Sequence, residues 1–259
     1  MYVRIVINES KCSRRLELSK KVVIQASGGI ESTTMLALAV STHGKENVLP
    51  IAFDTGSIFW KHRDSIAVKR VCTDLQIQNN LYICRMPNPD DFEYNRDGQY
   101  QDVGFIPGYK MMFNTAALSW AQRKGAEEVW IGNMADNVYP DESKDFITGL
   151  VDLFNRTYTS PEGVPAVKLV EPFKDASKGA VIKKAMELGV NLADTVSCGE
   201  ERLAGGYNCG ICPWCLKRRY GFVEALVSDP TMYFFHSTYE FVHCFKKFID
   251  ERRAETNNT

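Results

Sequence analysis

Short apolar runs alternate with amphipathic segments along most of the chain. The apolar runs are rich in β-branched and aromatic residues and end at turn-forming or polar residues, which predicts strands at 22–26, 47–55, 80–86, 127–133 and 166–173. The segments between and after them have helical spacing, which predicts helices at 32–43, 60–75, 109–125, 144–158, 175–190 and 216–228. This alternation indicates an α/β fold with a parallel sheet flanked by helices, and such sheets bind ligands at the carboxyl ends of their strands.

The pattern divides the chain into a main domain and three smaller parts. We expect an N-terminal extension with a strand or hairpin at 1–20, the α/β domain at 21–195, a cysteine-rich segment with its helix at 196–228, and a helical tail at 229–259. Residues 87–104 are polar and rich in helix-breaking residues, which predicts a long surface loop. Asp175 is expected to cap the helix that follows it.

Composition and charge restrict the classes of function. The 259 residues are 44% hydrophobic, so the chain can bury a sizeable core, and the formal net charge of −1 argues against a nucleic-acid partner. The basic run at 217–219 is interpreted as a solvated helix face. The N-terminus lacks the layout of a signal peptide and no apolar run is long enough to cross a bilayer, so we expect a cytoplasmic protein without a membrane partner. The oligomeric state stays open, with a homodimer as one option.

The turn after the first core strand has an unusual composition. Ser27-Gly28-Gly29 follows the run at 22–26, and Ser32 and Thr33 open the apolar helix. Glycines permit positive φ and close approach of a ligand to the backbone, and the N–H groups and dipole of a helix N-terminus attract anions. The combination predicts a phosphate or pyrophosphate site. The alternative is a tight strand-to-helix turn with a serine cap.

Four of the eight cysteines form a local cluster. Cys198, Cys209, Cys212 and Cys215 have the spacing C-x10-C-x2-C-x2-C, and the residues between the first two are mostly polar. Without a signal peptide such a cluster indicates metal ligands, and four thiolates match a structural zinc ion. An iron–sulfur cluster is the main alternative, and four reduced core cysteines are a further one.

Two motifs together resemble a known family. The segment 27–33 is similar to the SGG-x-[DE]-S-T loop of the ATP pyrophosphatase superfamily, with Glu31 where an aspartate is usual. That loop and the C-terminal sequence YNCGICPWCLKRRYGF look like the 7-cyano-7-deazaguanine synthase family, over residues 20–228. The resemblance implies a Rossmann-like fold of the adenine nucleotide alpha hydrolase type. It also implies that the pyrophosphate of ATP is held by Ser27, Gly28, Gly29, Ser32 and Thr33.

The resemblance also implies a reaction. Members of the family use ATP and Mg²⁺ to adenylate the carboxylate of 7-carboxy-7-deazaguanine, which releases pyrophosphate. Ammonia then displaces AMP to give an amide, and a second activation converts the amide to a nitrile. Catalytic roles would fall on Lys178, Arg218 and Glu31, and Glu31 and Asp54 would also contact ATP. The simpler alternatives are solvated surface charges for Lys178 and Arg218, and a strand-end turn residue for Asp54.

Asp141 is the candidate for recognition of the purine edge. Its segment, VYPDESKDF, is similar to a YPD-x4-F loop of the family, and one carboxylate can accept hydrogen bonds from the N1–H and N2–H groups of a guanine-like ring. Tyr109 and Lys110 are the other substrate candidates, because FIPGYKMMFNTAA is similar to the PGRN-x2-F helix start of the family. A turn role after Pro140 is the alternative for Asp141.

The chain departs from the family pattern around the substrate. Tyr109 and Lys110 replace Arg and Asn, and Glu142 and Ser143 replace Cys and Arg after Asp141. These changes leave open an amine larger than ammonia, such as a protein N-terminus in a modification or antiphage defence system. A tRNA thiolase and an inactive nucleotide-binding module are two further alternatives. The four clustered cysteines and the charge of −1 argue against the thiolase.

Overall fold

The computed structural model describes six segments of the chain, which are 20–56, 63–87, 108–135, 139–157, 166–199 and 208–234. The predicted hairpin at 1–20, the loop at 87–104 and the helical tail at 229–259 lie almost entirely outside these segments. The described segments contain the α/β core and the four clustered cysteines.

The core is a five-stranded sheet in which every pair of neighbours is parallel, in the order β3-β2-β1-β4-β5. The strands are β1 (Val22–Gln25), β2 (Val48–Asp54), β3 (Tyr82–Arg85), β4 (Glu128–Trp130) and β5 (Lys168–Val170). Each strand lies inside one of the apolar runs. The predicted α/β fold with a parallel sheet is therefore confirmed.

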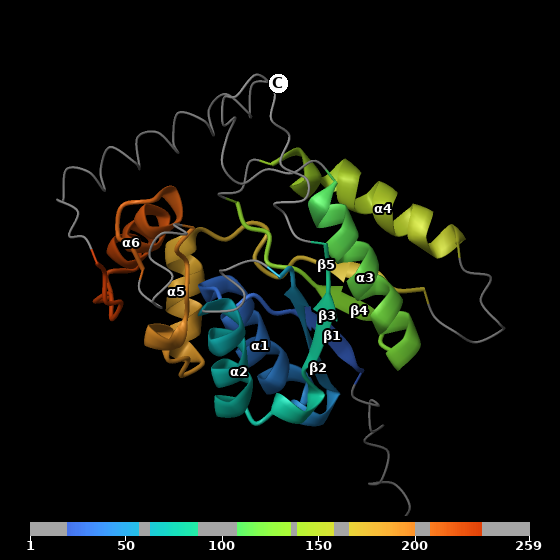
Figure 1. Ribbon diagram of the computed structural model, residues 1–259, viewed down its shortest axis with the longest axis horizontal. Helices are drawn as coiled ribbons and strands as arrows, with labels where there is room; N and C mark the ends of the chain where they lie inside the picture. Colours follow the sequence, from blue (N-terminus) through green and yellow to red (C-terminus); the bar gives the residue numbers. More distant parts are fainter. Residues whose placement is uncertain are drawn as a thin grey trace, which may run out of the picture.

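Helices cover both faces of the sheet (Figure 1). Helices α1 (Ile30–His43), α2 (Ser65–Asp74) and α5 (Lys178–Glu187) lie on one face, and α3 (Tyr109–Lys124) and α4 (Lys144–Arg156) lie on the other. Alternate side chains of β1 supply the two cores, because Val22 and Ile24 pack with the first group of helices and Val23 packs with the second. The central strand is thus buried on both faces, which explains its uninterrupted apolar sequence.

Several helix boundaries differ from the expectation, and the starts of α5 and of the last described helix have clear physical reasons. The cap of α5 is Ser177 rather than Asp175, because the Ser177 hydroxyl accepts a hydrogen bond from the Ala180 N–H at 3.2 Å. The Asp175 prediction was therefore wrong. The last described helix, α6 (Pro213–Ala225), begins earlier than expected, with a proline at its first position, where a missing N–H breaks no helical hydrogen bond.

The strand order creates a topological switch point at the centre of the sheet. β1 lies between β2 and β4, so the chain runs to one side of β1 first and later returns to the other side. Ligands of open α/β sheets bind beyond the carboxyl ends of the strands at such a point. Figure 1 shows the N-terminal ends of α3, α4 and α5 at this edge of the sheet. Functional residues are therefore expected after β1 and β4.

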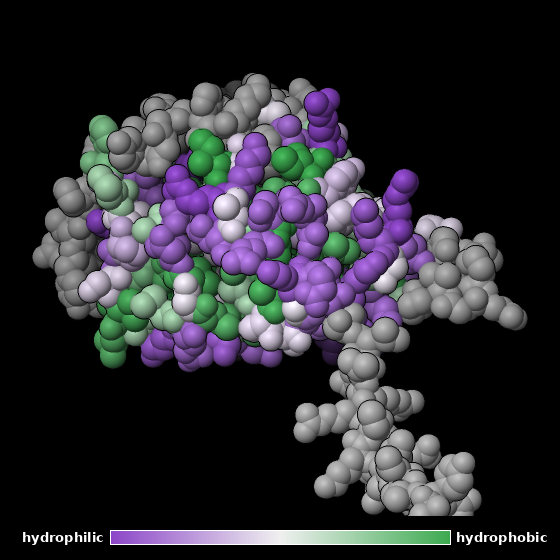
Figure 2. Space-filling model, turned by 90° about the horizontal axis from the view of Figure 1, so that it is seen from below, coloured by the Kyte–Doolittle hydropathy of each residue, from purple (hydrophilic) through white to green (hydrophobic). Residues whose placement is uncertain are grey.

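Figure 2 shows the molecule from below the view of Figure 1. On this face, hydrophilic side chains are interspersed with hydrophobic ones. Among the helices of the described segments, none has the length and apolar composition of a membrane span.

Candidate active site

The glycine turn after β1 is held from outside by α2. Gly28 has φ +79°, and a Cβ at this position would lie 2.8 Å from the Cβ of Ala67. The main-chain N–H of Val196 also donates to the Gly28 carbonyl at 2.9 Å. We expected the glycines to serve ligand approach. At Gly28, however, the absent side chain is already required by the packing of α2.

The hydroxyls of the turn gather at the N-terminus of α1. The Ser27 and Ser32 hydroxyl oxygens lie 3.1 Å apart, and Ser32 Oγ accepts the Ser27 N–H at 3.2 Å. The N-cap of α1 is Gly29, so a serine side chain does not cap this helix. Thr33 Oγ1 is buried without a hydrogen-bond partner in the described segments. The free N–H groups of the first helical turn and these hydroxyls together suit an anion.

An ion pair joins the glycine turn to the start of α5. The Lys178 ammonium contacts the Glu31 carboxylate, and the two side chains are 6% and 20% exposed. Burial acts to raise the pKa of Glu31, but the charge and hydrogen bond of Lys178, together with a backbone hydrogen bond and the charge of Lys217, hold this pKa below its usual value. Burial lowers the pKa of Lys178, against the opposing charge of Glu31. Lys178 is therefore not a solvated surface charge.

A second lysine, Lys217 on α6, lies close to the same carboxylate. Burial lowers the pKa of Lys217, and the charge of Glu31 opposes this shift. The interpretation of 217–219 as a solvated helix face was therefore wrong for Lys217, and also for Arg218, which is 0% exposed. Helix α6 approaches this region closely, because a Cβ at Gly221 would collide with the aliphatic stem of Lys178. The charges of two lysines thus act on one carboxylate, which leaves net positive charge to attract phosphate.

Asp141 lies on the short turn η6 (Pro140–Glu142), which follows β4. The residue is 6% exposed, and its Oδ1 lacks a hydrogen-bond partner among the described residues. Glu142 Oε2, on the next residue, is a second buried oxygen of this kind. Leaving a buried acceptor unpaired costs about 1–3 kcal/mol. A ligand with N–H donors would supply the partners that both oxygens lack.

The two carboxylates of η6 interact with one ammonium group. Lys110, in the first turn of α3, forms an ion pair with Glu142 and attracts Asp141 electrostatically. Burial lowers the pKa of Lys110 to about 8, an effect that the charge of Asp141 opposes. Positions 110 and 142 are two of those at which the chain departs from the family pattern. The structure shows that these two departures are in contact.

Tyr109 and Asp54 lie nearer to β3 and β2. The Tyr109 hydroxyl donates to the carbonyl of Pro87 at 2.9 Å, and so joins the start of α3 to the chain after β3. Asp54 Oδ1 accepts the N–H of Gly56 at 2.9 Å, which is the contact of a strand-end turn residue. Asp54 also ends β2, the neighbour of β1, and therefore lies at the edge of the sheet where a nucleoside is expected.

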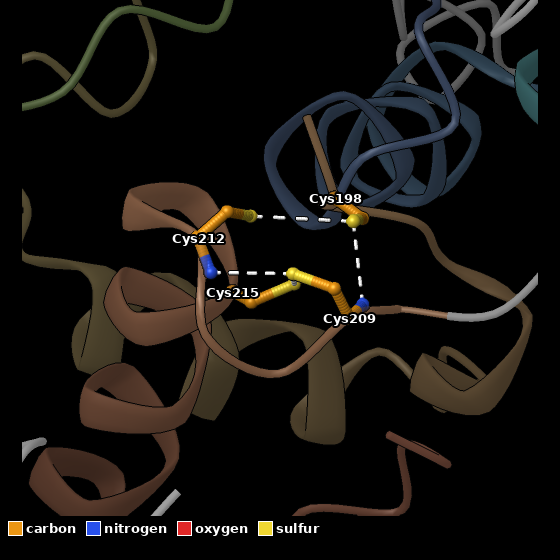
Figure 3. Close-up of side chains that lie close together, drawn as sticks. All are labelled: Cys198, Cys209, Cys212 and Cys215. Carbon is orange, nitrogen blue, oxygen red and sulfur yellow. Dashed lines mark hydrogen bonds between the residues drawn. The ribbon is translucent and has the colours of Figure 1, made fainter. Parts of the chain in front are cut away.

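The four clustered cysteines converge on one point (Figure 3). Their sulfur atoms all lie within 4.8 Å of one another, with 4.0 Å between Cys198 and Cys212 and 3.9 Å between Cys209 and Cys215. A tetrahedron with metal–sulfur bonds of about 2.3 Å has edges of roughly 3.8 Å. The Cys209 and Cys212 N–H groups donate to sulfur at 3.3 and 3.2 Å. The geometry therefore fits a tetrahedral metal ion.

The thiols of the cluster need a cation to ionise together. The hydrogen bond to Cys198 raises the pKa of the Cys212 thiol to about 11. Four adjacent thiolates would also repel one another, and a bound divalent ion removes this repulsion. The donor set thus favours a metal ion over four reduced core cysteines.

Arg218 connects the cysteine cluster to the glycine turn. Its side chain is fully buried, and its guanidinium donates to Thr195 Oγ1 and the Leu192 carbonyl, both at 2.8 Å, and to Ser197 Oγ at 3.2 Å. Between Thr195 and Ser197 lies Val196, whose N–H binds the Gly28 carbonyl. A side chain without exposed surface is placed to hold this segment rather than to meet a ligand. We therefore interpret Arg218 as a positioning residue.

The comparison with known families identifies the chain. The family model described as queuosine biosynthesis protein QueC matches residues 21–226. The chain belongs to the QueC family. It is 33% identical over 228 residues to the 7-cyano-7-deazaguanine synthase of Saccharophagus degradans, covering 83% of this chain and 98% of that protein. It is 31% identical over 233 residues to the enzyme of that name from Solidesulfovibrio magneticus, covering 83% and 96%.

One solved structure similar to this QueC-family chain is NMN synthetase from Francisella tularensis. The TM-score is 0.46 and the sequence identity 16%, over 91% of each chain.

The QueC-family site thus has two halves. We name them the anion half, consisting of the turn at 27–33 with Lys178 and Lys217, and the carboxylate half, consisting of Asp141 and Glu142 with Lys110. The charge of Lys217 acts on Glu31 in the anion half and on Lys110 in the carboxylate half. The sequence did not single out Lys217, nor the buried Asn133, whose amide donates to Glu171 at 2.9 Å at the ends of β4 and β5.

Proposed function

We propose that this QueC-family protein is an ATP-dependent ligase that acts on 7-carboxy-7-deazaguanine. It adenylates the carboxylate and transfers the acyl group to ammonia, to give first the amide and then the nitrile. Membership of the QueC family and the position of both halves at the switch point support this proposal. The single observation that carries it is the buried Asp141 Oδ1, which has no donor among the described residues.

The anion half supports the binding of the triphosphate. The N-terminus of α1 supplies N–H groups, and Lys178 and Lys217 supply positive charge in a buried environment. In the proposed complex this half binds the β- and γ-phosphates, through Ser27, Gly28, Gly29, Ser32 and Thr33. Pyrophosphate, rather than a single phosphate, then leaves.

The carboxylate half supports the binding of the purine. Asp141 would accept hydrogen bonds from the N1–H and the amino group of the deazaguanine ring, which would satisfy its buried oxygen. The ring carboxylate would then point from η6 toward the anion half. The charge of Lys217 acts on both halves, so this lysine would contribute positive charge to the bound substrates.

The proposed reaction has two bond exchanges. A carboxylate oxygen of the substrate attacks the α-phosphorus of ATP, and the bond from that phosphorus to the pyrophosphate oxygen breaks. Ammonia then attacks the acyl carbon, loses a proton, and the C–O bond to AMP breaks. Lys178 and Lys217 stabilise the charge that develops on the leaving pyrophosphate, and Glu31 keeps Lys178 in place. Conversion of the amide to the nitrile repeats the activation with a second ATP at the amide oxygen; the nitrogen then loses its two protons and the C–O bond to AMP breaks.

Two metal ions have different places in this proposal. Glu31 is the residue that would hold Mg²⁺ against the phosphates, where the ion would neutralise charge on the leaving group. The four cysteines would hold zinc, with no open position for chemistry. Through Val196 and Gly28, the zinc segment would fix the shape of the anion half.

Calorimetry on an Asp141 variant tests the purine site. Asp141→Ala should weaken binding of 7-carboxy-7-deazaguanine by about 2–4 kcal/mol, because two donors lose a charged acceptor. The affinity for ATP should stay near that of the wild type. Asp145→Ala, which changes an exposed aspartate in the first turn of α4 just after η6, is the matched control and should change neither affinity. Equal losses for both ligands in Asp141→Ala would mean that Asp141 only supports the turn.

A further inference from the structure

The turn η6 offers one more acceptor than Asp141 alone provides. The Glu142 side chain is only 7% exposed, and its Oε1 is engaged by the ammonium of Lys110. Its other oxygen, Oε2, is buried and has no hydrogen-bond partner within the described segments. A buried carboxylate oxygen in a folded protein normally has a donor. This oxygen therefore indicates a further N–H group on whatever binds beside Asp141.

The edge of a guanine-like ring supplies the required number of donors. A 2-amino-4-oxopyrimidine edge carries three N–H hydrogens, one on the ring nitrogen and two on the exocyclic amino group. The two oxygens of Asp141 can accept one hydrogen from each nitrogen. The second amino hydrogen then has no partner on Asp141. Glu142 is the adjacent residue on the same turn, and both carboxylates interact with Lys110.

We infer that Glu142 is a specificity-determining residue that accepts the second hydrogen of the exocyclic amino group of the substrate, and that Lys110 is the positioning residue that orients Glu142. The inference rests on the proposed function, because it requires a guanine-like ring at Asp141. It concerns two positions at which this chain differs from the family pattern and which are in contact.

The ion pair decides what an amide at position 142 would present. In Glu142→Gln, the ammonium of Lys110 can bond only to the carbonyl oxygen of the glutamine, because an ammonium group donates hydrogen bonds and cannot accept them. The NH₂ group of the glutamine must then face the ligand. This NH₂ group would then face the amino group of the substrate, where the wild type presents the oxygen Oε2 of Glu142. The substitution preserves shape and volume, so it changes the chemistry of the site rather than its packing.

Discrimination between two ligands tests this inference. We would measure by calorimetry the binding of 7-carboxy-7-deazaguanine and of its analogue that lacks the 2-amino group. The wild type should bind the amino ligand more tightly. Glu142→Gln should weaken binding of the amino ligand about 10- to 100-fold and that of the analogue less than about threefold. Lys110→Met should likewise reduce the preference for the amino ligand over the analogue. Lys110→Arg, which keeps an ion pair, should retain the preference of the wild type.

Each other outcome has a definite meaning. ATP affinity serves as the internal measure of folding, and Asp145→Asn should leave the ratio unchanged. If Glu142→Gln weakens both ligands equally, Glu142 only supports η6, and the inference fails while the purine site at Asp141 stands. A ratio that is unchanged in all variants leads to the same conclusion. If the wild type binds neither ligand, the proposed function is wrong and the inference fails with it.

Discussion

Replacing Gly28 with alanine tests how the glycine turn is held. The added Cβ would lie 2.8 Å from the Cβ of Ala67 and 3.4 Å from the main-chain oxygen of Asp64. Carbon atoms pack best at about 3.5–4.0 Å, so the turn or α2 must move by roughly 1 Å. Such overpacking costs about 1–3 kcal/mol, and the left-handed conformation adds about 1–2 kcal/mol for alanine. Gly28→Ala should therefore lower the free energy of unfolding by about 2–5 kcal/mol.

Gly56→Ala is the matched control. Gly56 also has positive φ, +70°, but no described atom lies within 4 Å of the place that its Cβ would take. Only the backbone strain of about 1–2 kcal/mol applies there. Urea unfolding followed by circular dichroism gives both values. Adding Ala67→Gly to Gly28→Ala removes the colliding atom, and the double-mutant cycle should show a coupling energy of about 1–3 kcal/mol.

Two results would refute this reasoning. Gly28→Ala and Gly56→Ala could destabilise the protein equally, or the coupling energy between positions 28 and 67 could be zero. Either result would mean that α2 does not restrain the turn. The functional consequence is measured with ATP: because the displaced turn carries the first N–H groups of α1, Gly28→Ala should weaken ATP binding and Gly56→Ala should not.

Three further predictions concern the charges and the cysteines. Lys178→Met should destabilise the fold by about 3–5 kcal/mol in urea unfolding, because it leaves the largely buried Glu31 carboxylate without its partner. The double variant with Glu31→Gln should recover part of this loss. We expect one zinc ion per chain in the wild type. Elemental analysis should show that Cys212→Ser has lost it, and this variant should unfold at a lower temperature. Burial lowers the pKa of Lys110 to about 8, so the ammonium that orients Glu142 is charged below this pH and neutral above it. Wild-type affinity for 7-carboxy-7-deazaguanine should therefore fall as the pH rises through about 8, and Lys110→Arg should not show this fall.

A specific result would contradict each of these predictions. A double variant no more stable than Lys178→Met would mean that the two charges are not coupled. Cys84→Ser, outside the cluster, should keep the metal, and equal loss from both cysteine variants would point to general unfolding. The pH test compares Lys110 with arginine because Asp141, Glu142, Glu171 and Lys217 face the same ammonium and remain in both proteins. Identical pH profiles would contradict the role of Lys110.

The centre of the sheet was predictable because β1, β2 and β4 are largely buried. The runs that became β1 and β2 are mostly apolar, and the glycine turn follows β1 at the place where the strand order reverses. The sulfur cluster was predictable for a similar reason, since C-x2-C spacing confines the ligands to a short length of chain. Both signals are local in sequence. The limit of such signals is the start of α5, where Ser177 and Asp175 are both capable caps and only the observed contact separates them.

The contacts between distant elements were not predictable. Lys217 and Arg218 are neighbours on α6, yet one approaches Glu31 and the other is enclosed by the segment around Thr195. Which residue does which depends on how α6 packs on α5 at Gly221. The pair of Lys110 and Glu142 likewise depends on the approach of α3 to η6. Sequence comparison marked both positions as departures from the family, but only the structure shows them in contact.

Product analysis tests the central claim most directly. The purified protein would be incubated with ATP, Mg²⁺, 7-carboxy-7-deazaguanine and ammonia, and the products identified by mass spectrometry. We predict AMP and pyrophosphate in equal amounts, together with the amide or nitrile of the deazaguanine. Release of ADP and phosphate, or an unchanged carboxylate in the presence of a protein that binds both ligands, would contradict the account.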